Sequence, residues 1–288
     1  MPKTFHTVVF QAREGGGNPC PVTLEADCLS EEQMQQMTKE FGEESVYLMR
    51  PTRPDCDVKA RYFVPLHEME MCIHATIGAA TVLVRQGVFR ASPIRFETFF
   101  GPVQVDWTPT EDGIDAGVNQ FLPRYMERNP SADEVCRVLG IAPEDLGPGP
   151  IQSVATSRWK LIVPLQSRAV LDGLRPDFPA LWELCGQYGT TGFYPYALER
   201  DEAGAPLFFA RQFPRQAGYN EDPATGVAAS ALGAYLAQHR VLPLAEGWNR
   251  YTVMQGFAMG RPSVLFSEIR MENGSITGTR VRGSARIL

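Results

Sequence analysis

Two carboxylates and one imidazole are the residues of this chain best suited to chemistry. Glu44 follows a helix stop, His74 opens a run of small apolar residues, and Asp222 precedes Pro223 before a second such run. Carboxylates and an imidazole in one cleft can remove a proton from carbon and return it, with no metal or cofactor. Glu44, His74 and Asp222 are therefore the candidate catalytic residues.

Each of these residues also has an ordinary structural explanation. Glu43 and Glu44 are typical of a solvated turn, a lone histidine is more often structural, and an acid before Pro223 is typical of a helix start. If Glu44 instead enters a cleft, burial is expected to raise its pKa. Cys72 is interpreted mainly as a small buried packing residue, because the second run has no matching thiol.

The two small-residue runs resemble each other. Arg61–Pro65 parallels Arg211–Pro214, and His74–Ala80 parallels Asp222–Ala229, which matches Gly78 with Gly226. Chance is the alternative, but two such copies are typical of a duplicated domain. Each copy predicts a strand, a loop and a buried helix, so two helix N-termini would converge on one cleft. Helix N-termini offer free N–H groups that suit a carboxylate.

Composition and motifs exclude several classes of function. The 288 residues suit one large or two smaller domains, and a net charge of −6 argues against nucleic acid or anionic membrane as a partner. No apolar run reaches a membrane span and no signal peptide is recognised, so a cytoplasmic location is expected. Six scattered cysteines predict free thiols. The chain has no P-loop, no nucleotide-type glycine motif and no HxxxH, so we predict neither cofactor nor metal.

Local signals predict an α+β fold. A capping box at Ser30 begins a predicted helix that runs to Phe41 and stops before Gly42. A second capping box at Ser131 begins another helix. The proline-containing segment 121–130 is the predicted linker. The predicted domains span residues 1–122 and 131–274, with residues 275–288 free to pack back on the first. Each domain is expected to be a mostly antiparallel sheet around one central helix, and the two are expected to be pseudo-symmetric.

The chain resembles the PhzF-like phenazine biosynthesis family, which has a diaminopimelate epimerase-like fold. The resemblance covers nearly the whole length and depends on the order and spacing of several short motifs. These motifs are Gly17–Pro19, Ser30–Met34, Glu44–Leu48, Arg61–Pro65, His74–Thr76 with Gly78, Glu221–Gly226, and Gly256 with Gly260–Ser263.

The resemblance implies a homodimer without a cofactor, with the active site in the cleft between two similar domains. It implies isomerisation of a small unsaturated carboxylic acid, as in dihydrohydroxyanthranilate isomerisation. Glu44 would abstract and return the proton, while His74 and Asp222 assist it and hold the substrate. The matching substrate-binding positions are Asn18, Ser45, Ile73, Ala75, Thr225, Gly226 and Val227.

Three positions depart from the family pattern and keep other functions open. Glu43 replaces a serine, Ile73 a glycine and Val227 a serine. Glu43 would raise the pKa of Glu44 if both point inward, and Ile73 fills space beside the ligand. One alternative is an epimerase or racemase of an amino-acid-like compound, with Cys72 or Asp222 as its second base. Another is a non-catalytic ligand-binding protein on the same fold.

Overall fold

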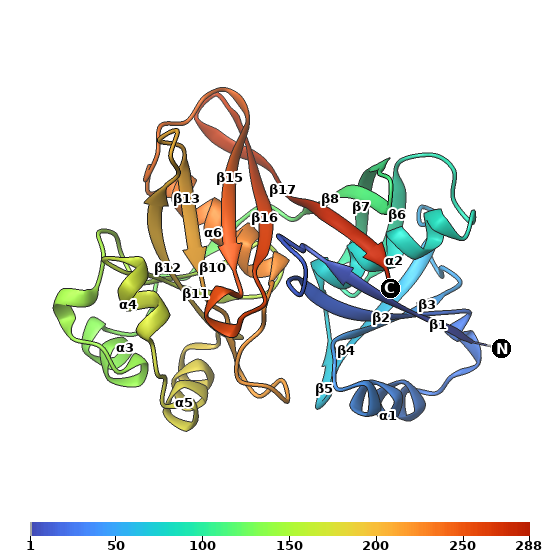
Figure 1. Ribbon diagram of the computed structural model, residues 1–288, viewed down its shortest axis with the longest axis horizontal. Coiled ribbons are helices and arrows are strands. Elements are labelled where there is room, and N and C mark those ends of the chain that lie inside the picture. Colours follow the sequence, from blue (N-terminus) through green and yellow to red (C-terminus); the bar gives the residue numbers. More distant parts are fainter. Residues whose placement is uncertain (1) are drawn as a thin grey trace.

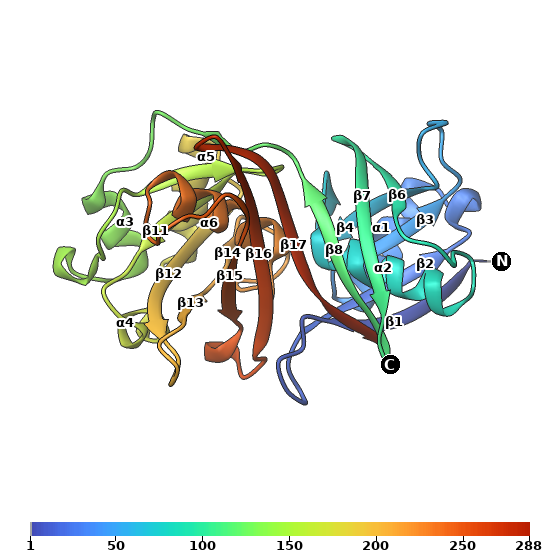
Figure 2. The same ribbon diagram turned by 90° about the horizontal axis from the view of Figure 1, so that it is seen from above.

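The structure is a computed structural model that describes residues 2–288 (Figure 1). It is a mixed α/β architecture rich in sheet, and its 17 strands form one hydrogen-bonded network. The ribbon has two lobes, and both chain ends lie in the same lobe (Figures 1 and 2). Within residues 2–288, no helix is both long and apolar enough to cross a membrane.

Eight strands of the first lobe close into a ring. In ring order, these are β1 (Lys3–Val9), β2 (Asn18–Leu24), β3 (Ser45–Met49), β4 (Val58–Val64), β6 (Ile94–Thr98), β7 (Gly101–Pro109), β8 (Gly113–Gln120) and β17 (Ser275–Ile287). The short strand β5 (His67–Met69) pairs with β4. Helix α2 (Ile73–Arg85) packs against β1, β2, β3, β8 and β17. The C-terminal strand thus completes the wall around α2.

The second lobe surrounds helix α6 (Gly226–Gln238) with a sheet that ends on the same strand β17. Its strands are β9 (Arg124–Tyr125), β10 (Gln152–Ala155), β11 (Lys160–Pro164), β12 (Gly192–Arg200), β13 (Pro206–Ala210), β14 (Phe213–Pro214), β15 (Gly247–Gln255) and β16 (Ser263–Glu272). All of α6 up to Ala237 is buried. A helix with no polar face needs apolar neighbours on every side, which the strands supply. Most strand pairs in both lobes are antiparallel, as predicted.

Four further helices cover the outside of the sheets. Two of them, α1 (Glu31–Phe41) and α3 (Ala132–Leu139), begin at the predicted capping boxes of Ser30 and Ser131 and end at glycines in the left-handed conformation. Helix α5 (Phe178–Tyr188) begins after Asp177, whose side chain caps it. Helix α4 (Arg168–Gly173) was not predicted. The mixed sheet-rich fold is confirmed; the division into two pseudo-symmetric domains stays a prediction.

The starts of the two central helices differ from the prediction. Asp222 is not a helix cap, because α6 begins only at Gly226 and no side chain caps it. His74 does not precede α2 but is its second residue. Gly78, matched with Gly226 in the sequence, is the sixth residue of α2, whereas Gly226 is the first of α6. Because small residues recur throughout both helices, the sequence match of Gly78 with Gly226 was shifted by more than one helical turn.

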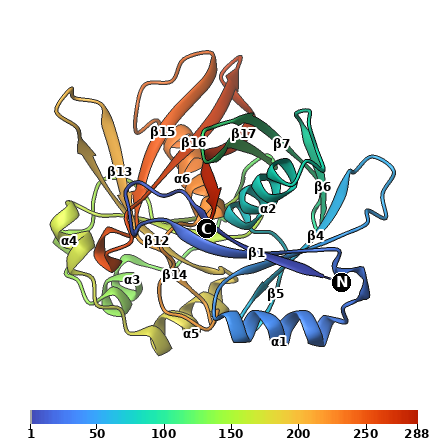
Figure 3. The same cartoon turned by 45° about the vertical axis from the view of Figure 1, so that its right-hand side comes forward.

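Helices α2 and α6 lie next to each other (Figure 3), and their starts are in direct contact through Ile73 and Gly226. A Cβ atom built on Gly226 would lie 2.6 Å from both Cβ and Cγ2 of Ile73. Glycine is therefore required at this position if α2 and α6 are to meet end to end. Ile73 fills the space from the side of α2.

We expect Gly226→Ala to destabilise the protein by about 1–3 kcal/mol, because well-packed interiors accommodate an added methyl group poorly. Urea unfolding measures the loss. The control Gly173→Ala adds the same atom at the end of α4, where nothing lies within 4 Å. In an Ile73→Gly background the cost of Gly226→Ala should shrink. An equal cost in both backgrounds would contradict the contact.

Candidate active site

A small buried cavity lies where the starts of α2 and α6 meet. Its volume is about 40 Å³, close to the space of one water molecule. Segments far apart in the chain build its wall, including the three candidate catalytic residues. The lining residues are Glu44, His67, Met69, Met71, Cys72, Ile73, His74, Arg158, Lys160, Thr191, Gln212, Pro214, Arg215, Ala217, Tyr219, Asp222, Thr225, Gly226 and Val227.

Glu44 immediately precedes β3, and its side chain, 12% exposed, turns into this cavity. The thiol of Cys72 donates to Glu44 Oε2 at 3.1 Å, and the hydroxyl of Tyr219 donates to Oε1. His74 Nδ1 lies 3.5 Å from Oε2 and 3.1 Å from Cys72 Sγ. The solvated-turn explanation for Glu44 is therefore wrong.

These contacts decide the charge of Glu44. Burial raises its pKa, but His74 when protonated, the two donated hydrogen bonds and the charge of Arg158 outweigh burial, so the pKa lies below its ordinary value. Burial acts in the expected direction, but the expected net rise in the pKa of Glu44 is wrong, and Glu43 is not among the groups that shift it. For Glu43 itself, burial does raise the pKa, although Arg261 and His6 oppose it.

The groups around Glu44 are neutral hydrogen-bond donors or acceptors. Burial, followed by the charge of Glu44, raises the pKa values of Cys72 and Tyr219 well above their usual range, so both keep their protons at neutral pH. Burial lowers the pKa of His74 despite the opposing charge of Glu44. Glu44 is thus the ionised member of this group.

Asp222, in contrast to Glu44, keeps its proton at neutral pH. Burial, with the charge of Glu44, raises its pKa to about 8. Its carboxyl group accepts from Asn18 Nδ2 at 2.6 Å and from the hydroxyl of Thr225. Gln255 Nε2 donates to the backbone oxygen of Asp222 at 2.7 Å. One cavity therefore holds an ionised carboxylate and a protonated carboxylic acid at neutral pH.

Four of the seven predicted substrate-binding residues line the cavity. Ile73, Thr225, Gly226 and Val227 form the meeting point of the two helix starts. Asn18, Ser45 and Ala75 are not among its lining residues. The amide nitrogen of Asn18 donates to Asp222 and to the oxygen of Ala224, and the Ser45 hydroxyl donates to the oxygen of Glu43. The backbone N–H of Ala75 faces the sulfur of Cys72.

Sequence analysis missed Tyr219, Lys160 and Gln212, which also line the cavity. Lys160 carried a usable signal, because it is the one charged residue in the otherwise apolar strand β11. Gln212 lies in the segment Arg211–Pro214, and Tyr219 lies between that segment and Asp222. Nothing in their spacing indicates that they turn inward. Only the fold brings Tyr219 to Glu44.

Tyr219 also lines a wider hollow of about 750 Å³. His67, Arg158, Thr191 and Arg215 line both spaces. Binding sites for small molecules usually measure about 300–1,000 Å³, so the inner cavity must open to admit an organic acid. The shared wall makes the outer hollow the entry path, with Tyr219 between it and Glu44.

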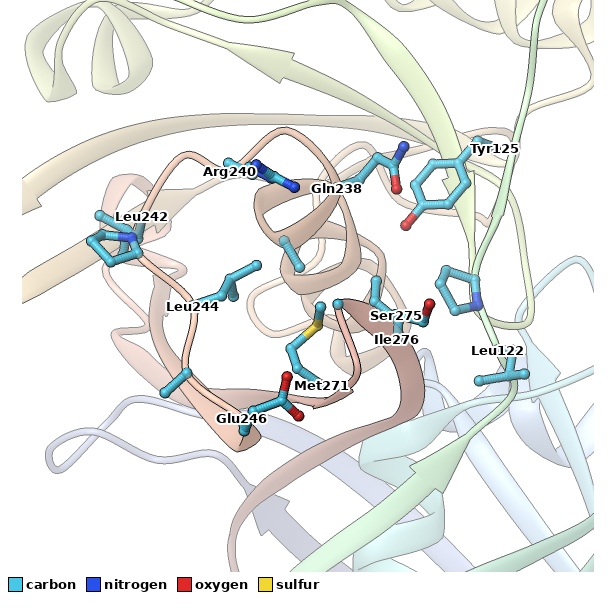
Figure 4. A pocket seen from close by; sticks show the side chains of 15 residues that line it. Leu122, Tyr125, Gln238, Arg240, Leu242, Leu244, Glu246, Met271, Ser275 and Ile276 are labelled. Atoms are coloured by element: carbon cyan, nitrogen blue, oxygen red, sulfur yellow. The ribbon is translucent and has the colours of Figure 1, made fainter.

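A larger cavity lies elsewhere and has no comparable chemistry. It measures about 980 Å³ and lies between the end of α6 and the β16–β17 hairpin, with Leu122 and Tyr125 on its far side (Figure 4). Its charged residues are Arg240 and Glu246, and no histidine or cysteine lines it. We therefore place the chemical site at the smaller cavity.

Three side chains of the site are close enough to hold a metal ion. The ligand atoms of Glu44, Cys72 and His74 lie within 4.8 Å of one another. Here the thiol proton of Cys72 lies in a hydrogen bond to Glu44, and a metal would have to displace that proton. The donor set therefore permits a metal, and the hydrogen bond gives these residues a function without one.

We expect the contribution of Asp222 to stability to fall as pH rises from 5 to 7, while the lowered pKa of His74 acts in the opposite direction. Folded Asp222 keeps its proton up to about pH 8, whereas the unfolded chain releases it near the ordinary value of 3.8. Folding therefore takes up a proton, and the loss approaches about 1.4 kcal/mol per pH unit. Urea unfolding at several pH values, with Asp222→Asn as the comparison, should show that the substitution removes this slope.

Asp57→Asn is the matched control. Hydrogen bonds from Arg95 lower the pKa of Asp57, so it is ionised in both folded and unfolded chains between pH 5 and 7. This substitution should leave the slope unchanged. Parallel pH profiles for wild type and Asp222→Asn would contradict a protonated Asp222.

The chain is similar to known proteins over nearly its whole length. Residues 8–288 match the family model described as phenazine biosynthesis-like protein, PhzC-PhzF. A relative from Deinococcus radiodurans, named an uncharacterized isomerase, is 30% identical over 100% of this chain and 93% of its own. Trans-2,3-dihydro-3-hydroxyanthranilate isomerase of Pseudomonas aeruginosa is 29% identical over 93% of this chain and 90% of its own.

A solved structure of a protein from this family is also similar to the chain. The Bacillus anthracis phenazine biosynthesis protein of the PhzF family superposes with a TM-score of 0.86 at 25% identity, covering 99% of this chain and 96% of that one. The prediction of an isomerase is confirmed at the level of enzyme class by the curated relatives. The chain belongs to the phenazine biosynthesis-like (PhzF) family.

Proposed function

We propose that the protein is a cofactor-independent isomerase that moves a proton on a small unsaturated carboxylic acid. The observation that carries this proposal is the pairing of an ionised Glu44 with a protonated Asp222 in one cavity. Two carboxyl groups whose pKa values are driven apart suit a base and an acid in the same reaction. Glu44 is the general base and, once protonated, returns the proton to another carbon.

The helix starts hold the substrate carboxylate. The first N–H groups of α2 and α6 have no partner within their own helices and carry the positive end of each helix dipole. Gly226 and Val227 present these groups from one side and Ile73 from the other, whereas the N–H of Thr225 donates to Gln255 Oε1 at 3.1 Å. His74 and Asp222 then contact the reacting part of the substrate.

Substrate entry also changes the pKa of Glu44, the general base. An acid that reaches Glu44 from the outer hollow displaces the hydroxyl of Tyr219 from Oε1. Loss of that hydrogen bond raises the pKa of Glu44 toward its ordinary range. Glu44 thereby becomes a stronger base when the substrate arrives.

An epimerase of an amino-acid-like compound is the second candidate. It requires a base on each face of the substrate. Cys72 lies in contact with Glu44 and therefore on the same side of the cavity. Asp222 is the better second base, but it carries a proton at neutral pH. These positions favour the isomerase.

Deuterium exchange at carbon tests the proton transfer. The protein is incubated in heavy water with dihydrohydroxyanthranilate and a panel of small unsaturated and amino carboxylic acids, and mass spectrometry follows deuterium gain. We expect Glu44→Gln to slow exchange by about 100- to 10,000-fold, the usual contribution of a general base. Glu43→Gln changes the same functional group one residue away and should keep the activity.

The other variants separate the alternatives. Exchange that survives Glu44→Gln moves the base to Asp222 or Cys72. Loss of exchange in both Glu44→Gln and Cys72→Ala favours the epimerase. Ligand-induced thermal stabilisation without exchange favours a binding protein. Exchange that persists in the presence of EDTA is expected, whereas its loss would assign a metal to Glu44, Cys72 and His74.

We further propose a cytoplasmic homodimer whose subunits each contain two pseudo-symmetric domains, residues 1–122 and 131–274. The two central helices of equal length support this division, since α2 and α6 each contain 13 residues. Residues 275–288 then belong to the first domain, because β17 pairs with β1 and β8. Sedimentation equilibrium should give twice the mass of 31.9 kDa. A single-chain mass would refute the dimer.

A further inference from the structure

Lys160 is a buried cation without a counterion at hydrogen-bond distance. Only 3% of its surface is exposed, and it lies at the start of β11 facing the inner cavity. Among residues 2–288, it has no hydrogen bond and no carboxylate within 4.0 Å. Arg158, a half-buried cation that also lines the cavity, has an acidic partner in Glu70 at 3.0 Å.

Gln212 is a second buried polar group without a partner. It is 1% exposed, and neither its amide nitrogen nor its amide oxygen has a hydrogen bond among residues 2–288. Leu161 pairs with Phe193, which pairs with Phe213, so Lys160, Gly192 and Gln212 lie on the opposite face of these strands. That face borders the cavity, which both Lys160 and Gln212 line.

Gly192 leaves space between these two side chains. A Cβ atom at this position would lie 2.5 Å from Gln212 Nε2, so any larger residue would collide with the amide. Because Gly192 has no side chain, the amide of Gln212 can lie directly against the Gly192 backbone. The ammonium of Lys160 and the amide of Gln212 are then neighbours on one wall.

The unpaired state of both groups has a cost. A buried polar group without a hydrogen bond destabilises a protein, and an unpaired charge does so more strongly. The charged groups around Lys160 are Arg158, which repels it, and Glu44, which attracts it from beyond 4.0 Å; Asp222 attracts it only when ionised. Burial and Arg158 lower its pKa to about 7, and Cys185 is its remaining titratable neighbour. An anion placed between Lys160 and Gln212 would remove these costs.

We propose that Lys160 and Gln212 form a subsite that binds a second carboxylate of the substrate. This inference rests on the proposed function, in which the helix starts hold the first carboxylate. The substrate class is therefore a small unsaturated dicarboxylic acid. One carboxylate lies on the N–H groups of α2 and α6, the other lies between the ammonium and the amide, and the carbon that loses its proton lies near Glu44.

The arrangement of charge along the entry path agrees with a dianion. Arg158 and Arg215 line both the outer hollow and the inner cavity. A substrate with two negative charges passes these cations before it reaches Lys160. Glu44 is the one ionised acid it meets inside, because Asp222 keeps its proton.

Matched pairs of ligands test the second carboxylate. The probes are glutarate and isophthalate, each compared at pH 6.5 and constant ionic strength with its own monoamide, which keeps the shape and removes one charge. Isothermal titration calorimetry measures binding to wild type and to Glu44→Gln. We expect at least one diacid to bind about tenfold more tightly than its monoamide. Lys160→Met should abolish this preference and Gln212→Leu should reduce it.

Lys39→Met is the control, because Lys39 is an exposed lysine of α1 far from the cavity. It should keep the full preference. Lys160→Met and Gln212→Leu remove unpaired buried groups, so both should fold with a melting temperature at or above that of wild type. A lower melting temperature in both would show that the two side chains are paired in solution and overturn the subsite.

The binding result and the exchange result are independent. A diacid preference that needs Lys160, found without deuterium exchange, supports the subsite and refutes the isomerase. Exchange on monocarboxylic acids with no diacid preference supports the isomerase and overturns the subsite. Failure of both diacids to bind more tightly than their monoamides overturns the subsite as well.

Discussion

The contact between the starts of α2 and α6 is the constraint on which the rest of the structure depends. Both helices are apolar on all sides, so each must be enclosed by strands, and β17 contributes to both enclosures. Ile73 fills the place that Gly226 leaves open. Because the two enclosures meet at this point, the loops that precede both helices lead to one cavity. Cys72 and Asp222 reach it from those loops, and Glu44 reaches it from the turn before β3.

Burial alone does not set the chemistry of that cavity. It raises the pKa of every acid there, yet Glu44 and Asp222 end in opposite states. Glu44 has donors from Tyr219 and Cys72 and positive charge nearby, which outweigh burial. Asp222 also accepts hydrogen bonds, but the negative charge of Glu44 adds to its burial. The interaction between the two carboxyl groups therefore separates a base from an acid.

Much of the local structure could be predicted from sequence, and so could the residues most suited to chemistry. The capping boxes at Ser30 and Ser131 and the glycines that end their helices depend on neighbours a few residues away. Glu44, His74 and Asp222 all line the cavity. The internal repeat was matched in the wrong register, because a run of small residues fits itself equally well after a shift.

The sequence by itself determined the mixed sheet-rich fold, the two buried helices and the family, because hydrophobic patterning, caps and motif order are local properties. Only the tertiary structure decided that the pKa of Glu44 is lowered, since its partner Tyr219 lies 175 residues away in the chain. It also decided that Asn18 supports Asp222 and that Lys160 and Gln212 lie unpaired on one wall. Side-chain direction and the distance between remote segments depend on how the strands close around the helices, which spacing along the chain does not encode.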